Sequence, residues 1–242
     1  MALRPWSPIP IRECGEPLLE LPAALWRLEP HPYLQLGAPY GPMGDPFRLR
    51  LGVLERLLQA QQELQRCHPC WQLAIFDAWR PLAVQSFMVR HALVQECERL
   101  GVDPNQPSSL RDRIEAEVGR FWAPPSDDPA TPPPHSTGAA VDLTLADRAG
   151  CPLPMGGAID AIGAVSAPDF HAEAALAEPD GEAAHWHRQR QQLASAMTSA
   201  GFVQHPYEWW HFSWGDQLWA WRSGGVEARY GRVGDQQGSG NN

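Results

Sequence analysis

Two short segments of the sequence carry residue types that can hold a catalytic metal ion. One runs from His135 to Asp142, and the other contains Glu208 and His211. Two neutral imidazoles and one carboxylate leave the fourth position of a tetrahedral Zn²⁺ ion open for water, which is typical of catalytic rather than structural sites. We therefore predict His135, Asp142 and His211 as ligands of one Zn²⁺ ion per chain. Glu208 is predicted to be the general base that takes a proton from the attacking water and returns it to the leaving amine.

Arg80 is a candidate for stabilising negative charge. It follows a short apolar run and directly precedes Pro81. A guanidinium group stays protonated, so Arg80 can stabilise a developing oxyanion or hold a substrate carboxylate without taking part in proton transfer. Taken alone, an Arg before a Pro at the end of a strand is more often a surface or capping residue. The case for Arg80 depends on the motifs that accompany it.

The elements that position these residues follow from the spacing of apolar side chains. Leucines at nearly helical spacing predict an amphipathic helix over residues 51–66. The apolar run at residues 71–77 predicts a strand. Pro81 suits the first turn of a helix that we expect to reach about Leu100. Arg80 then lies in the connection between this strand and this helix.

The region before His135 is rich in proline, with six prolines in residues 123–134. Such a stretch would ordinarily indicate a linker between domains. Arg80 precedes the stretch and His135 follows it, however, and both are required in one site. We therefore predict a rigid surface loop that delivers His135 to a cleft.

Two further helices are expected. Ser109 and Asp112 form a weak capping-box pattern for a helix that runs toward Phe121. Residues 182–200 predict another helix, for which Gly201 is the C-terminal stop.

A strand is expected to begin at Ala140. Apolar and polar positions alternate from there, which predicts a half-buried strand with Asp142 on the more polar face. Strands and helices are interspersed without a regular βαβ rhythm or a glycine-rich phosphate loop, so we predict an α+β fold.

The spacing of Glu208 and His211 sets a geometric condition. Residues 202–214 are expected to be rich in β structure, and residues three apart on a regular strand point to opposite faces. Both side chains can therefore share a cleft only if a bulge or turn intervenes, and Pro206 favours such an irregularity. A helical turn also fits this spacing, but the aromatic and β-branched residues nearby favour a strand.

Composition limits the possible partners. The chain has 242 residues, a formal net charge of −9 and a pI near 5.4. Nucleic acids and anionic membranes would require a cationic face, so neither is expected as a partner, and a small substrate fits better. The N-terminal residues carry no apolar run of signal-peptide length, and we expect a cytoplasmic protein.

The cysteines do not suggest a disulfide framework, because their number is odd and their spacing scattered. They are Cys14, Cys67, Cys70, Cys97 and Cys151. The Cys67–Cys70 pair closes a predicted helix, whereas a redox pair usually opens one. We interpret both as incidental thiols.

Four ordered segments together resemble the D-alanyl-D-alanine dipeptidase family, the zinc dipeptidases of the vancomycin-resistance type. They are residues 76–81, 135–145, 154–160 and 208–211, and the resemblance runs from about Leu51 to Trp214. It implies that His135, Asp142 and His211 bind zinc, that Glu208 is the general base and that Arg80 stabilises the transition state. It also implies that Asp160 pairs with the ammonium group of the substrate.

The resemblance carries further expectations. It implies a mainly antiparallel sheet flanked by helices, as in zinc D-Ala-D-Ala peptidases and the hedgehog signalling domain, and hydrolysis of the free dipeptide D-Ala-D-Ala. We expect a single domain over residues 1–235, in which residues 1–50 diverge from the family, and a disordered tail over residues 236–242.

The sequence also departs from the family. Pro133 and Pro134 replace serines that commonly precede the first zinc histidine, which affects substrate preference more than chemistry. An N-terminal tyrosine of the family has two candidate counterparts, Tyr33 and Tyr40. Two other functions stay open: a metallopeptidase acting on longer peptidoglycan peptides, and a zinc-stabilised binding domain without catalysis.

Overall fold

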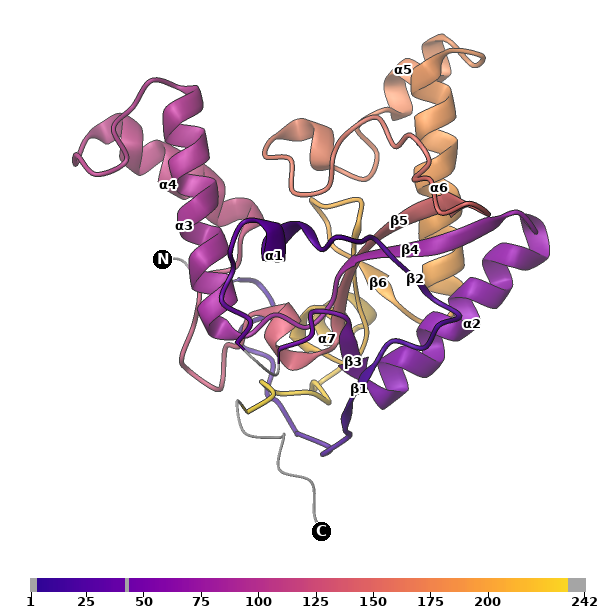
Figure 1. Ribbon diagram of the computed structural model, residues 1–242, viewed down its shortest axis with the longest axis horizontal. Coiled ribbons are helices and arrows are strands. Elements are labelled where there is room, and N and C mark those ends of the chain that lie inside the picture. The colour runs from indigo at the N-terminus through magenta and orange to yellow at the C-terminus, as the bar shows by residue number, and fades with distance from the viewer. Residues whose placement is uncertain (1–3, 42–43, 235–242) are drawn as a thin grey trace.

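The centre of the molecule is a five-stranded sheet with the order β2-β4-β5-β7-β6, seen in a computed structural model that describes residues 4–41 and 44–234 (Figure 1). Only β2 and β4 pair in parallel, and the other neighbours are antiparallel. A separate antiparallel pair joins β1 to β3. The strands are β1 (Leu18–Glu20), β2 (Trp26–Arg27), β3 (Arg48–Arg50), β4 (Trp71–Asp77), β5 (Ala140–Asp147), β6 (Val203–Gln204) and β7 (His211–Ser213). The α+β prediction with a mainly antiparallel sheet is confirmed.

Helices flank the sheet, and the long ones lie close to where the sequence places them. They are α1 (Pro32–Gln35), α2 (Leu51–Cys67), α3 (Leu82–Arg99), α4 (Ser109–Phe121), α5 (Ala172–Ala177), α6 (Glu182–Ser199) and α7 (Gln217–Ser223). Gly201 follows α6 with φ of 89°, a conformation that favours glycine and ends the helix as predicted. The predicted disordered tail, residues 236–242, lies outside the described residues.

One helix cap differs from the prediction. The side chain that caps α4 belongs to Ser108, whose Oγ accepts a hydrogen bond from the backbone N–H of Arg111. Ser109 is instead the first residue of the helix. Ser108 and Ser109 are adjacent, and only the one with an extended backbone can cap the helix, a difference that the sequence pattern does not record.

Two apolar clusters hold the elements together. In the larger one, α2 and α6 pack against one face of the central sheet through residues that include Leu57, Leu193 and Leu143. In the second, α3 and α4 pack against each other and against the N-terminal segment around Tyr33 and Tyr40. Figure 1 shows α3 and α4 together on one side of the molecule and α2 and α6 together on the other.

Strand β5 is more deeply buried than the sequence predicts. Leu143 and its apolar neighbours face α2 and α6 as expected, but Asp142 on the opposite face is only 2% exposed. The prediction of a half-buried strand is therefore wrong. The polar face is covered by other polar side chains, His135, His211 and Arg80, which contact Asp142.

The hairpin between β6 and β7 meets the geometric condition set by Glu208 and His211. His211 begins β7, while Glu208 lies in the connecting turn and not on the strand. Pro206 lies in the same turn. The prediction that a turn intervenes is confirmed, and the alternative of a helical turn is wrong.

An irregularity at the end of β4 changes which way its last residue points. Ile75 pairs with Leu143 and Asp77 pairs with Asp142, so two steps on β4 match one step on β5. Side chains alternate between faces along a regular strand. The extra residue therefore brings Asp77 to the same face as Asp142 and away from the apolar cluster that contains Ile75.

The buried face of β5 yields a stability prediction. Leu143 is fully buried between the sheet and its helices, so Leu143→Ala should lower the free energy of unfolding by about 2–5 kcal/mol in urea titrations. Leu176→Ala is the matched control, because Leu176 is 84% exposed and its truncation should change stability by less than about 0.5 kcal/mol. Equal effects of the two substitutions would contradict this packing.

Candidate active site

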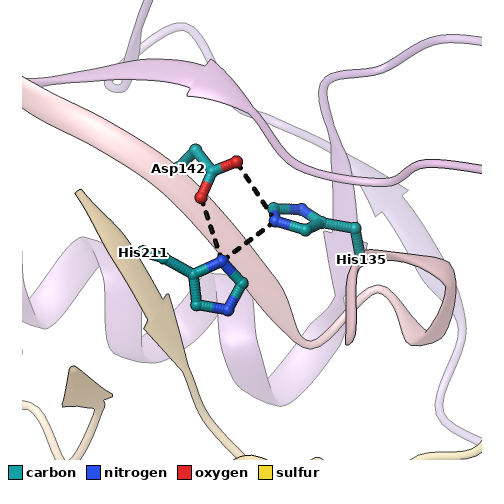
Figure 2. Close-up of side chains that lie close together, drawn as sticks. All are labelled: His135, Asp142 and His211. Atoms are coloured by element: carbon teal, nitrogen blue, oxygen red, sulfur yellow. Dashed lines mark hydrogen bonds and ion pairs between the residues drawn. The ribbon is translucent and has the colours of Figure 1, made fainter. Parts of the chain in front are cut away.

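Asp142 and His211 are neighbours across two strands. They are paired residues of β5 and β7, which places both side chains on one face of the sheet. His135 reaches the same point from the short 3₁₀ helix Pro134–Thr137, and this helix ends at Gly138, whose φ of 69° turns the chain into β5. Figure 2 shows the three side chains converging from these three places in the sequence.

The three side chains are separated by hydrogen-bond distances. Nε2 of His135 lies 3.1 Å from Oδ2 of Asp142, and Nδ1 of His211 lies 3.1 Å from Oδ1 of the same carboxylate. The two ring nitrogens are themselves 3.1 Å apart. All three residues are buried, and one donor atom from each lies within 4.8 Å of the others.

Partners on the far side of each ring determine where the imidazole protons lie. Nδ1–H of His135 donates to the carbonyl oxygen of Ala78 at 2.7 Å. Nε2–H of His211 donates to Oγ of Ser213 at 3.3 Å, and Ser213 in turn donates to Asp216 at 2.8 Å. In its neutral form, each ring therefore directs its unprotonated nitrogen toward the carboxylate of Asp142. Two nitrogen lone pairs and a carboxylate that face one another form a donor set that suits a metal cation.

Asp142 stays ionised although it is buried. Burial alone would raise the pKa of its carboxyl group, but the neighbouring His135 and His211 lower that pKa far below its usual value. Asp142 is therefore an ionised acceptor.

Glu208 lies beside this cluster. Its carboxylate oxygens are 3.5 Å from Nδ1 of His205 and 3.7 Å from Nδ1 of His211. Burial, and then the negative charges of Asp142 and Asp160, raise the pKa of Glu208 well above the usual carboxyl value. Burial also lowers the pKa of His205 well below its usual value, so this neighbour is a neutral ring.

The irregular end of β4 holds Arg80 in the site. Nε and Nη2 of Arg80 donate to Oδ2 of Asp77 at 3.0 and 2.7 Å. Nη2 also reaches Oδ2 of Asp142 at 3.3 Å, and Nη1 donates to Gln85. Burial would raise the pKa of Asp77, but the charge of Arg80 overcomes this and lowers it. Arg80 is thus a buried cation already paired with a carboxylate.

Asp77 is a site residue that sequence reasoning missed. Its other oxygen, Oδ1, accepts a hydrogen bond from the hydroxyl of Tyr40 at 2.9 Å and lies 3.1 Å from Nε2 of His31. Its position at the end of an apolar strand gave no chemical signal, because its orientation depends on the irregularity in β4.

Asp160 faces the site in an unusual backbone conformation. Its φ of 65° is the only positive value for a residue other than glycine among the described residues, and such conformations cluster at functional sites. The hydroxyl of Tyr33 donates to Oδ2 of Asp160 at 2.6 Å, and Arg80 donates to that hydroxyl at 3.2 Å. Of the two tyrosine candidates, Tyr33 therefore contacts Asp160. Burial, and then the charge of Asp142, raise the pKa of Asp160 to about 7.

One pocket is lined by all of the site residues that the sequence predicts. They are Arg80, His135, Asp142, Asp160, Glu208 and His211. Arg4, Trp6 and His205 also line this pocket. Of these, only His205 is close in sequence to a motif residue, whereas Arg4 and Trp6 come from an N-terminal segment without a recognisable pattern.

The family model and two curated relatives that match this chain are all described as D-alanyl-D-alanine dipeptidases. A family model described as "D-ala-D-ala dipeptidase" matches residues 27–232, which extends beyond both ends of the resemblance found from motifs. A D-alanyl-D-alanine dipeptidase of Synechocystis sp. is 45% identical over 231 residues, covering 91% of this chain and 90% of that protein. A D-alanyl-D-alanine dipeptidase of Escherichia coli is 33% identical over 141 residues, covering 58% and 54%.

Solved structures of low identity are also similar. A mutant of the vancomycin resistance D,D-pentapeptidase VanY in complex with Zn(II) is 12% identical, with a TM-score of 0.46 over 91% of this chain and 96% of that one. VanYB in complex with D-alanine-D-alanine is 14% identical, with a TM-score of 0.43 over 77% and 82%.

The pairing of Asp77 with Arg80 yields a second prediction. Asp77→Asn leaves the guanidinium of Arg80 buried without its main carboxylate partner and should lower the free energy of unfolding by about 3–5 kcal/mol. Adding Arg80→Met removes that charge, so the double variant should be more stable than the sum of the single effects by about 0.5–3 kcal/mol. Glu63→Gln is the control, because it breaks an exposed pair with Arg66 that contributes at most about 1 kcal/mol. Additive effects at residues 77 and 80 in urea titrations would refute the coupling.

Proposed function

Since the chain belongs to the D-Ala-D-Ala dipeptidase family, we propose that it hydrolyses the free dipeptide D-alanyl-D-alanine to two molecules of D-alanine with one zinc ion per chain. The observation that carries the proposal is the convergence of two imidazoles and a carboxylate beside Glu208 in one pocket, where all of these side chains are buried. The Synechocystis protein, 45% identical, is a D-alanyl-D-alanine dipeptidase.

His135, Asp142 and His211 would hold the zinc ion. The donor set of two imidazoles and one carboxylate is that of catalytic zinc sites, and Ala78 and Ser213 orient the two rings from behind. When bound, zinc acts as a Lewis acid that makes water nucleophilic near neutral pH and polarises the scissile carbonyl.

Glu208 would move the proton. Its carboxylate takes a proton from the attacking water and delivers it to the nitrogen of the leaving D-alanine. A raised pKa makes a carboxylate a stronger base, and the burial of Glu208 supports this role.

Arg80 and Asp160 would bind opposite charges. The guanidinium of Arg80, held by Asp77, stabilises the negative charge that develops on the carbonyl oxygen in the transition state. Asp160, held by Tyr33, would pair with the ammonium group of the substrate, which favours the ionised form of this carboxyl group.

The surroundings of the site agree with a small substrate. Pro134 lines the pocket next to His135, so the replacement of the family's serines affects the pocket wall directly.

Among the described residues, no helix combines the length and apolarity needed to cross a membrane. A cytoplasmic location stays a prediction.

The substitution Glu208→Ala tests whether Glu208 is the general base of a catalytic site. The variant should bind as much zinc as the native protein, because Glu208 is not among the three ligands, while kcat/KM for D-Ala-D-Ala should fall at least about 10²–10⁴-fold. The native protein should cleave D-Ala-D-Ala but neither L-Ala-L-Ala nor N-acetyl-D-Ala-D-Ala. Equal cleavage of the acetylated peptide would refute the ammonium role of Asp160 and favour longer cell-wall peptides. Zinc binding without any cleavage would favour a binding domain.

Zinc binding itself can be measured without activity. Added zinc should raise the thermal midpoint of the native protein, since a ligand at about 1,000 times its Kd adds about 4 kcal/mol of stability. Asp142→Ala should abolish most of this rise and lower the bound zinc well below one ion per chain. A full zinc response in Asp142→Ala would contradict the proposed ligand set.

A further inference from the structure

The pocket contains a second arginine that forms no ion pair with any described residue. Among the residues lining the pocket, the guanidinium groups are those of Arg4 and Arg80. Arg80 is paired with Asp77 and Asp142. Arg4 has no carboxylate within ion-pair distance in residues 4–41 and 44–234. Its guanidinium therefore has no direct carboxylate partner there, although the charge of Glu208 acts on it from a greater distance.

Backbone carbonyls at the end of α4 hold Arg4 in place. Nη1 donates to the carbonyl of Arg120 at 3.0 Å, and Nη2 donates to those of Gly119 and Trp122 at 2.7 and 3.4 Å. Nε–H makes no hydrogen bond to any described residue, and a guanidinium has five N–H donors. Arg4 therefore has an immobilised side chain with donors left for a ligand.

Trp122 connects the two arginines. Its carbonyl oxygen accepts from Arg4, while the guanidinium of Arg80 lies 5.1 Å from its ring centroid. Trp6, two residues after Arg4, packs edge-on against His205, with ring centroids 5.6 Å apart. The N-terminal segment thus forms a wall of the same pocket and is not a separate surface feature.

Outside the three proposed ligands, the pocket carries side chains of both charge signs. Burial lowers the pKa of Arg4, and the charges of Glu208 and Tyr207 oppose this change. Asp160 is bound to Tyr33 and interacts with the charges of Asp142 and Arg80. The same pocket therefore offers an acidic group for an ammonium ion and a cation for a carboxylate.

Other donors for a carboxylate are scarce. None of the described residues that line the pocket has a hydroxyl group. Gln85, the only amide among them, already accepts from Arg80 and donates to the carbonyl of Ala123. Arg4 is the lining residue best suited to this role.

We propose that Arg4 binds the C-terminal carboxylate of the substrate and, together with Asp160, restricts the enzyme to dipeptides with both ends free. The inference rests on the proposed function and adds a specificity-determining residue to it. Arginine suits this role because its guanidinium stays charged, and because Nε–H and the second hydrogen of Nη1 are left to hydrogen-bond to a carboxylate.

The test compares two substrates that differ only in the charge at the C-terminus. D-Ala-D-Ala and D-alanyl-D-alaninamide are given to the zinc-loaded native protein, Arg4→Met and Arg4→Lys. Arg4→Met should lower kcat/KM for D-Ala-D-Ala about 10–100-fold, mainly through KM, and leave the amide within about twofold. Arg4→Lys should recover part of the loss, because it keeps the positive charge but not the guanidinium hydrogen bonds that hold Arg4 in place.

The control is Arg12→Met. Arg12 belongs to the same N-terminal segment, and its side chain is 82% exposed, so this variant should leave both substrates unaffected. Zinc content and thermal midpoint should match among the variants.

The outcomes separate the inference from the function on which it rests. An equal loss on acid and amide would assign Arg4 a purely structural role and overturn the proposal, as would no loss on either. If the native protein cleaves neither substrate, the proposed function fails. Calorimetric binding of the same two ligands then tests Arg4 independently, and an equal affinity of native protein and Arg4→Met for the dipeptide acid would overturn the proposal.

Discussion

The irregularity at the end of β4 positions more of the site than any other local feature. It brings Asp77 level with Asp142 on the face opposite the apolar core, where Asp77 binds Arg80. The next residue, Ala78, directs its carbonyl oxygen to Nδ1 of His135. The one additional residue in β4 thus determines the position of the Asp77 carboxylate, its ion pair with Arg80, and the ring nitrogen of His135 that carries the proton. A regular strand would point Asp77 into the apolar cluster, where a carboxylate is costly.

The site as a whole places several carboxyl groups close together in a buried space, where their negative charges repel one another. Asp77, Asp142, Asp160 and Glu208 are four carboxyl groups in or beside one pocket, and Arg80 directly pairs with only two of them. Burial, and then the remaining repulsion from Asp142, raise the pKa values of Asp160 and Glu208. A divalent cation at the three ligands and an ammonium group at Asp160 would relieve it, so binding of metal and substrate is favoured by the same imbalance.

The sequence predicts the parts of this structure that depend on local patterns. Helix α2, strand β4 and the turn before His211 follow from the spacing of side chains and from Pro206. Contacts between distant segments were not predictable in this way. Tyr33 reaches Asp160 across 127 positions, and Arg4 reaches Trp122 across 118. The burial of Asp142 was missed for the same reason, because alternation along β5 cannot show which distant polar side chains will cover its polar face.

The central claim is that two imidazoles and one carboxylate bind the metal, and X-ray absorption at the zinc K-edge of the zinc-loaded protein tests it most directly. The account predicts nitrogen ligands at about 2.0–2.1 Å and carboxylate oxygen at about 2.0–2.2 Å, with no sulfur. Substitution of Asp142 by Ala should alter this spectrum. A sulfur ligand at about 2.3 Å would assign the metal to cysteines such as Cys67 and Cys70, both exposed, and would contradict the account.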